Sequence, residues 1–283
     1  MALFEIVPNI SEGRDPGTIE AAVAAMTAAG VRVLHRTSDP AHHRSVITAA
    51  GSGEQTVAAA VALARVAAER IDLRRHRGEH PRMGALDVLP FVPLAGATLD
   101  DAVTLARRAG ERIWRELGIP SVLYGAAASA PHRVNLGDVR HGEFEALAER
   151  SRDPRWAFDY GDGPHAGAGA IAIGARPFLL AFNVELDSGD LDLARTIART
   201  LRERDGGLRT LRALGFRIAP DVVQLSFNLT DVDAVPLYRV RELVRLAAAR
   251  RGVALRRSEL IGLAPRRTID RTARAYLAAE RGS

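Results

Sequence analysis

Residues 71–93 read IDLRRHRGEHPRMGALDVLPFVP and divide into a polar loop and an apolar run. Residues 53–70, just before this stretch, carry the apolar repeat of a helix, and residues 86–94 form an extended run that prolines interrupt. Between them lie histidine, glutamate and arginine residues, with Pro81 directly after His80. Ionisable residues on a loop held by apolar elements are typical of a functional site. We therefore expect a helix, a polar loop that carries a site, and a strand.

The same alternation of strand and helix extends in both directions along the chain. In the first half we expect strands at 3–11, 31–38, 45–52, 86–94 and 121–126, and helices at 15–29, 53–70, 98–117 and 141–150. In the second half we expect apolar strands at 169–175, 177–187, 214–218, 222–231 and 253–265, and helices at 190–204, 236–251 and 266–280.

Each half therefore has the order strand–helix–strand–strand–helix–strand, or a close variant of it. This order favours two α/β sandwiches, each a sheet with helices on one face, over one doubly wound sheet. The glycine-rich stretch Gly161–Gly174 is the favoured connection, because glycine-rich segments are flexible. We divide the chain into residues 1–176 and 177–283.

Composition excludes several classes of function. The 283 residues include no cysteine and no lysine, so disulfides, thiolate nucleophiles, Schiff-base lysines and P-loop lysines are excluded. The net charge of +5 comes from arginines interleaved with acidic residues, and no nucleic-acid motif accompanies them, so we expect no nucleic-acid partner. No apolar run approaches the roughly 20 residues of a membrane helix, and the N-terminus does not resemble a signal peptide. We therefore expect a cytoplasmic protein without a membrane partner.

His80 is the candidate catalytic residue, flanked by Glu79 and Arg82. A histidine with a pKa near neutral can accept a proton and return it within one turnover. A solvated loop histidine is the plain alternative. Residues 76–80 also spell H-x-x-E-H, a zinc-protease signature that requires both histidines on one helical face. Pro81 disfavours helical backbone at His80, so we expect no such helix and no metal.

Two other polar segments are expected at strand ends. Asp39 lies in the turn SDPAHHR, where its carboxylate could orient a catalytic histidine or simply serve the turn. Arg44 follows that turn and is a candidate to bind a substrate carboxylate, as is Arg82. Asn9 and Glu12 lie at the exit of the first strand, where we expect them to face the end of the sheet.

The motifs, taken together, resemble those of one family. RGEHPRMGALDVLPFVP is similar to the central signature of the glutamate formimidoyltransferase family. VPNISEGR resembles its opening motif, and SDPAHHRSVIT, SVLYGAAA, RHGEFEAL, GARPFLLAFNVEL and SELIGLAP resemble its later blocks in the same order. The resemblance covers essentially the whole chain.

This resemblance implies two ferredoxin-like α/β subdomains with a ligand cleft or tunnel between them, and a homodimer. It implies transfer of a formimidoyl group from N-formimidoyl-L-glutamate to N5 of tetrahydrofolate, a reaction of histidine degradation. The catalytic histidine of the family's G-E-H-P motif corresponds to His80. Tetrahydrofolate is the implied co-substrate, and the implied folate loop comprises Gly161, Asp162, Gly163, Pro164, His165, Gly167, Ala168 and Gly169.

The chain departs from the family pattern in this loop. The family usually has a tryptophan where Ala168 stands, and the loss of an aromatic surface would weaken stacking with a pterin. This departure leaves a folate-binding homologue without catalysis as an alternative. A related transferase that uses N-formylglutamate as the donor with the same machinery is a second alternative.

Overall fold

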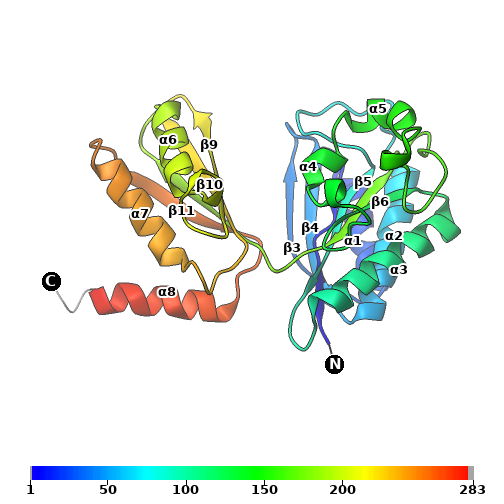
Figure 1. The fold of residues 1–283 in the computed structure, drawn as a ribbon, viewed down its shortest axis with the longest axis horizontal. Coiled ribbons are helices and arrows are strands. Elements are labelled where there is room, and N and C mark those ends of the chain that lie inside the picture. The colour runs from blue at the N-terminus through cyan, green and yellow to red at the C-terminus, as the bar shows by residue number, and fades with distance from the viewer. Residues whose placement is uncertain (1, 280–283) are drawn as a thin grey trace. The chain divides into compact units, whose positions relative to one another are not determined.

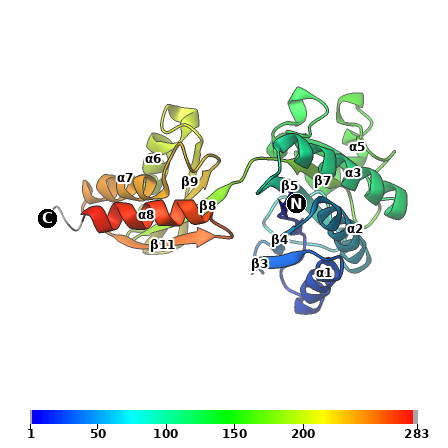
Figure 2. The ribbon, with the colours of Figure 1, turned by 90° about the horizontal axis from the view of Figure 1, so that it is seen from below.

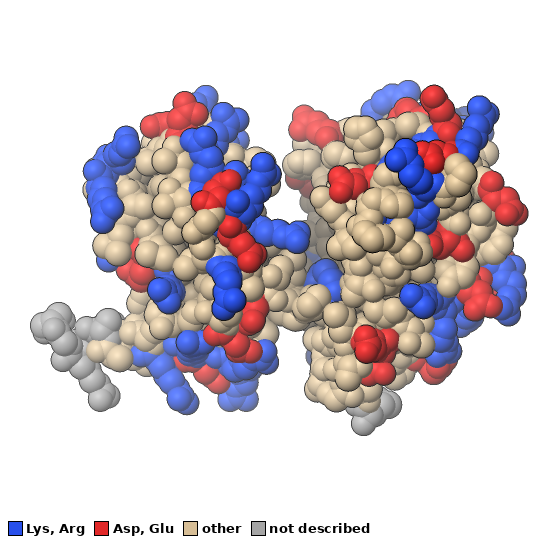
Figure 3. Space-filling model, in the orientation of Figure 1, with Lys and Arg blue, Asp and Glu red and all other residues tan. Residues whose placement is uncertain are grey.

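The computed structural model describes residues 2–279. They form two compact units, one ending at Pro177 and the other beginning at Phe178 (Figure 1). In the described residues, no helix is both long and apolar enough to cross a bilayer. On the face drawn in Figure 3, arginines and acidic side chains alternate over each unit without forming a continuous basic stripe.

The first unit contains a seven-stranded sheet. Its strands are β1 (Phe4–Ile6), β2 (Asn9–Ile10), β3 (Arg32–Asp39), β4 (Arg44–Gly51), β5 (Leu86–Pro93), β6 (Ser121–Gly125) and β7 (Ile171–Ala175). β1 and β2 both pair antiparallel with β4 on one side and with β5 on the other. β3 lies outside β4, and β7 lies parallel between β5 and β6. Across the sheet, β3, β4, β1 with β2, and β5 follow the split βαβ arrangement. β7 and β6 extend the sheet beyond β5.

Three long helices cover one face of this sheet: α1 (Pro16–Ala28), α2 (Gly53–Arg70) and α3 (Leu99–Leu117) (Figure 2). Capping boxes begin α2 at Ser52 and α3 at Thr98, and Gly118 ends α3 in a left-handed conformation. The shorter helices α4 (Leu136–Val139) and α5 (Glu143–Arg150) contribute Val139 and Leu147 to a second apolar cluster. Short 3₁₀ turns occur at Pro131–Arg133 and Pro154–Trp156.

The second unit has a four-stranded antiparallel sheet in the order β11-β8-β10-β9. Its elements are β8 (Leu180–Leu186), α6 (Leu191–Leu201), β9 (Leu211–Ala219), β10 (Val222–Leu229), α7 (Leu237–Ala249), β11 (Leu255–Ile261) and α8 (Arg266–Ala279), with a 3₁₀ turn at Glu203–Asp205. The chain order strand–helix–strand–strand–helix–strand is the ferredoxin-like pattern. The prediction of two α/β sandwiches is confirmed.

The expectation that the glycine-rich stretch Gly161–Gly174 connects the halves is wrong. Residues 171–175 form β7 in the middle of the first sheet, so the run 169–175 belongs to the first unit. The glycines here permit close backbone contact rather than flexibility. A β-carbon on Gly84 would lie 2.2 Å from the Ala170 carbonyl oxygen, and one on Gly169 would lie 2.1 Å from the Met83 carbonyl oxygen.

Two strands differ in continuity from expectation. The first strand is divided at Val7 and Pro8, whereas β5 is continuous through Pro90 and Pro93. The Pro90 carbonyl accepts a hydrogen bond from Val7 N at 3.3 Å. The side of Pro90 that lacks an N–H therefore faces the break between β1 and β2. Because the partner strand is interrupted at this point, proline is tolerated in the central strand β5.

Candidate functional site

His80 lies in the loop between α2 and β5, and its imidazole is half-buried. Its Nδ1 lies 2.7 Å from the Pro81 carbonyl oxygen, which can only accept a hydrogen bond. Nδ1 therefore carries the proton, and Nε2 of the neutral ring is the free base. Burial lowers the pKa of His80 to about 4, helped by the charges of Arg44 and Arg140. At neutral pH the ring is uncharged and able to accept a proton.

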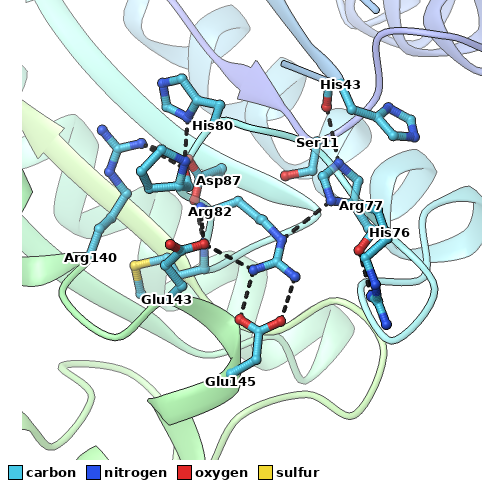
Figure 4. A network of polar contacts seen from close by, with 12 residues as sticks. Ser11, His43, His76, Arg77, His80, Arg82, Asp87, Arg140, Glu143 and Glu145 are labelled. Atoms are coloured by element: carbon cyan, nitrogen blue, oxygen red, sulfur yellow. Dashed lines mark hydrogen bonds and ion pairs between the residues drawn. The ribbon is translucent and has the colours of Figure 1, made fainter. Parts of the chain in front are cut away.

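Asp87, the second residue of β5, is the buried centre beside His80. Its side chain is fully buried, and its Oδ1 accepts from Met83 N at 2.8 Å. Its Oδ2 accepts from Arg44 Nη1 at 2.7 Å and from Arg140 Nη1 at 3.1 Å. Arg140 Nη1 also donates to the Pro81 carbonyl at 3.2 Å, so His80 and Arg140 converge on one oxygen (Figure 4).

Asn9 and Arg44 are brought together at this centre. The Asn9 side-chain oxygen accepts from Arg44 Nε at 3.2 Å and from Arg44 Nη2 at 3.0 Å, while Asn9 Nδ2 donates to the Val7 carbonyl at 2.8 Å. The guanidinium group of Arg44, at the start of β4, is thereby fixed between Asn9 and Asp87, and Arg44 is largely buried. A neutral base beside two oriented guanidinium groups suits a reaction with an anionic substrate that must exchange protons.

Arg82 is buried in a separate ion-pair network. Its guanidinium donates to Glu145 Oε1 and Oε2 at 2.6 and 2.7 Å and to Glu143 Oε2 at 3.1 Å, and its Nε donates to His76 Nδ1 at 3.3 Å (Figure 4). The two glutamates belong to the first turn of α5. Arg82 thus fastens α5 to the His80 loop, and its donors are largely occupied by protein groups.

Asp39 is bonded to the turn that follows it. Its Oδ1 accepts from Ala41 N at 2.8 Å and His42 N at 2.9 Å, and its Oδ2 lies 2.7 Å from His42 Nδ1. These hydrogen bonds to His42 and Ala41 lower the pKa of Asp39. The His42 ring lies edge-on to His80 with centroids 6.1 Å apart. Within the part of the chain that the structure describes, Asp39 therefore reaches His80 through His42 rather than directly.

The His80 loop crosses the Asp39 turn at Gly78. A β-carbon on Gly78 would lie 2.5 Å from the His42 carbonyl oxygen, so glycine is required for this crossing. Glu79 N donates to the Ala41 carbonyl at 3.3 Å, while Glu79 itself is exposed. The crossing brings Asp39, His42 and His80 into one region from two loops.

Glu12 serves the start of α1. Its Oε1 accepts from Arg14 N at 2.7 Å and Asp15 N at 2.9 Å. The His43 Nδ1 lies 3.3 Å from the same oxygen, but it accepts a hydrogen bond from Gly13 N at 3.1 Å, and burial lowers the pKa of His43. A neutral His43 stacks on His76, with ring centroids 4.3 Å apart. These contacts connect Glu12 to the back of the His80 loop.

The expected folate loop packs against the same segment. His165 and Gly169 exchange two backbone hydrogen bonds of 2.9 Å, and His165 Nδ1 accepts from Ala168 N at 3.0 Å. The Ala168 carbonyl accepts from Ala85 N at 2.9 Å, and the Ala168 methyl lies in the core at 2% exposure. Ala168 therefore offers no surface to a ligand in this structure.

The remaining loop residues are less buried. Gly161, Gly163, Pro164, His165 and Gly167 are partly exposed, and Asp162 is exposed. A β-carbon on Gly163 would meet no atom within 4 Å, so this part of the loop borders open space.

The zinc-protease alternative requires a helix that is not formed. Residues 76–80 contain no helical turn, as Pro81 led us to expect. Within residues 2–279, no group of three or more acidic or histidine side chains is placed to hold a metal ion.

Three residues of the site were missed in the sequence. Asp87 lies inside the stretch 71–93 quoted above. It is the only acidic residue of the apolar run 86–94, and an isolated carboxylate in such a run is a signal of a buried functional or paired group. His42 belongs to the turn SDPAHHR, but only Asp39 and Arg44 at that turn were expected to act. Arg140 lies 53 positions from Asp87 and has no local signal beyond the RHGEFEAL block.

Two family models match this chain. Residues 3–176 match the N-terminal subdomain of the formiminotransferase domain, and residues 181–283 match the formiminotransferase domain. The chain belongs to the formiminotransferase domain family. The resemblance read from the motifs is therefore confirmed.

Relatives in this formiminotransferase family align over nearly the whole chain. A glutamate formimidoyltransferase of Thermoplasma acidophilum is 44% identical, covering 98% of this chain and 93% of its own length. One of Streptococcus pyogenes serotype M1 is 42% identical, covering 98% and 94%. The formimidoyltransferase-cyclodeaminase of Sus scrofa is 39% identical, and there the match covers 97% of this chain but 52% of the relative.

Proposed function

We propose that this protein is a glutamate formimidoyltransferase, which transfers a formimidoyl group from N-formimidoyl-L-glutamate to N5 of tetrahydrofolate. The observation that carries the proposal is the 44% identity to a glutamate formimidoyltransferase along 93% of that relative's length. The geometry around His80 supports it, because the reaction needs one group that removes a proton and returns it.

The transfer forms one bond and breaks one. N5 of tetrahydrofolate attacks the formimidoyl carbon, and a tetrahedral intermediate results. N5 must lose a proton, and the departing glutamate nitrogen must gain one as its bond to carbon breaks. We assign both transfers to His80 Nε2, the free nitrogen of the tautomer that the Pro81 carbonyl selects. General acid–base catalysis of this kind is worth about 10²–10⁴-fold in rate.

The other predicted residues take supporting roles in this proposal. Asp39 orients His42 beside His80. Arg44, held by Asn9, supplies positive charge for a donor carboxylate. The exposed part of the loop Gly161–Gly169 contacts tetrahydrofolate. The reaction uses no metal, belongs to histidine degradation in the cytoplasm, and is carried out by a homodimer.

Two measurements test the proposal. The purified protein is incubated with tetrahydrofolate and either N-formimidoyl-L-glutamate or N-formyl-L-glutamate, and 5-formimidoyltetrahydrofolate or 5-formyltetrahydrofolate is quantified. We expect turnover with the formimidoyl donor at a kcat/KM at least tenfold above that with the formyl donor. Faster turnover with the formyl donor would make the protein a formyltransferase. Binding of tetrahydrofolate by calorimetry without any turnover would make it a folate-binding protein without catalysis.

A further inference from the structure

Arg140, at the C-terminal end of α4, has hydrogen-bonding capacity that the protein leaves unused. Its side chain is 17% exposed, and its Nη1 is shared between Asp87 Oδ2 and the Pro81 carbonyl. Its Nε is buried and has no hydrogen-bond partner among the described residues. A buried guanidinium N–H without a partner costs free energy, so the protein alone does not fully satisfy this guanidinium group.

The charges around Arg140 are also unbalanced. Among residues 2–279, Asp87 is the one carboxylate bonded to the guanidinium groups of both Arg44 and Arg140. His80 carries no compensating negative charge, so the cluster holds one positive charge in excess. Buried charge without a partner is costly, and a bound anion would neutralise the cluster. Guanidinium groups recognise carboxylates by paired hydrogen bonds.

We propose that Arg140, backed by Arg44, binds the α-carboxylate of the glutamyl donor and so places the donor nitrogen against His80 Nε2. This inference rests on the proposed function and names a subsite within it. The sequence suggested this carboxylate-binding role for Arg82, but Glu143 and Glu145 already occupy the N–H donors of Arg82. The inference assigns the role to Arg140 instead.

The spacing of atoms in the donor selects the α-carboxylate over the γ-carboxylate. The α-carboxylate and the nitrogen that carries the formimidoyl group are attached to the same carbon, whereas two further carbons separate the γ-carboxylate from it. His80 Nδ1 and Arg140 Nη1 bond one oxygen, at 2.7 and 3.2 Å, so imidazole and guanidinium are neighbours. With the α-carboxylate on Arg140, the donor nitrogen lies only two bonds from the bound group and stays near the His80 ring, whereas the γ-carboxylate would place it four bonds away.

Occupation of the subsite would also change His80. The groups that face its ring are Arg44, Arg140, Asp87 and the His42 ring, and the two arginines lower the pKa of His80. A bound carboxylate opposes their field and raises that pKa toward neutrality, where a histidine accepts and returns protons most effectively. The base would thus become stronger when the donor is in place.

The test compares donors and variants together. N-formimidoyl-4-aminobutyrate lacks the α-carboxylate, and N-formimidoyl-L-2-aminobutyrate lacks the γ-carboxylate. For the unaltered protein we expect removal of the α-carboxylate to lower kcat/KM about 10–100-fold, the usual effect of a lost charged hydrogen bond. In Arg140→Gln the full donor should lose a similar factor, and the penalty for the missing α-carboxylate should largely disappear. Arg140→Lys should retain part of the preference for donors that carry the α-carboxylate. The control Arg152→Gln, at an exposed position, should retain all of this preference.

Direct binding separates this inference from the proposed function. If no donor is turned over, the transferase proposal fails, but calorimetry with L-glutamate and 4-aminobutyrate still tests the subsite. We expect the folded protein to bind L-glutamate at least tenfold more tightly, and Arg140→Gln, with its fold checked by circular dichroism, to bind both alike. An Arg140→Gln protein that kept the full preference in both measurements would overturn the subsite. A rise in the KM for tetrahydrofolate, with donor preference intact, would assign the carboxylate to folate and overturn it too.

Discussion

His80 Nδ1 and Arg140 Nη1 both bond to the Pro81 carbonyl oxygen, at 2.7 and 3.2 Å. This shared acceptor selects the His80 tautomer and places a permanent positive charge beside the ring. Asp87 holds Arg140 in this position from the buried side. The chemistry of the imidazole is therefore coupled to a salt-bridge centre that Arg44, Asp87 and Arg140 assemble from three separate segments.

Replacement of His80 by alanine should remove catalysis without unfolding the protein. We expect kcat to fall about 10²–10⁴-fold, the usual contribution of a general acid–base group. His80 lies on a loop and is partly exposed, so the thermal midpoint should change little. The matched control is His35→Ala, a partly buried histidine on β3. Comparable kcat values for His80→Ala and the unaltered protein would refute the assignment.

The titration of His80 should lie well below that of an ordinary histidine. Burial and the charges of Arg44 and Arg140 lower its pKa to about 4, so the ring stays neutral as the pH falls from 8 to about 5. NMR of histidine-labelled protein, with the His80 signal assigned through His80→Ala, measures this directly. Arg140→Gln removes one positive charge and should move the midpoint upward. A His80 midpoint near 6.5 in the unliganded protein would contradict the buried, positive surroundings described above.

Asp87→Asn should destabilise the protein strongly. The asparagine oxygen can still accept a hydrogen bond, but Arg44 and Arg140 lose their common counter-charge in a fully buried position. Breaking a buried pair in this way typically costs about 3–5 kcal/mol of unfolding free energy. Urea denaturation followed by circular dichroism measures the change. Asp153→Asn, which breaks only the exposed pair with Arg155, should leave stability nearly unchanged.

Glu5 on β1 should make stability depend on pH. Its side chain is 4% exposed, and burial raises its pKa to about 7, with Arg176 acting in the opposite direction. Because the folded-state pKa lies above the unfolded value, folding favours the protonated acid, and stability declines as the pH rises from about 4.5 through 7.

Glu5→Gln cannot ionise and should escape this decline. Relative to the unaltered protein, the variant should gain roughly 2–3 kcal/mol of unfolding free energy between pH 4.5 and pH 8. Urea denaturation at both pH values, with the exposed Glu69→Gln as control, gives the comparison. A difference that is the same at both pH values would mean that folding does not change the pKa of Glu5.

Local signals in the sequence were sufficient for the elements. The bounds of α2 matched the expected 53–70 because an amphipathic period, a capping box at Ser52 and a polar loop after Arg70 agree with one another. The turn at Gly118 ended α3 as expected, because glycine readily adopts the left-handed conformation found there.

Contacts between distant residues were not predictable in the same way. Arg82 and Arg140 look equivalent in the sequence, yet one is paired with Glu145 and the other has an unused N–H. Their difference arises from where α4 and α5 pack, which no local pattern encodes. Gly169 was expected in a flexible segment, whereas it allows close contact with the backbone at Met83. The sequence alone does not distinguish these two roles of glycine.

The position of β7 has a consequence for the order of assembly. β7 is the last strand of the first unit along the chain, yet it pairs between β5 and β6. During synthesis, the strand that carries Asp87 must therefore keep a bare edge until residue 175 has left the ribosome. Exposed edges of this kind recruit other strands, so a nascent or truncated chain that stops short of β7 would be prone to self-association.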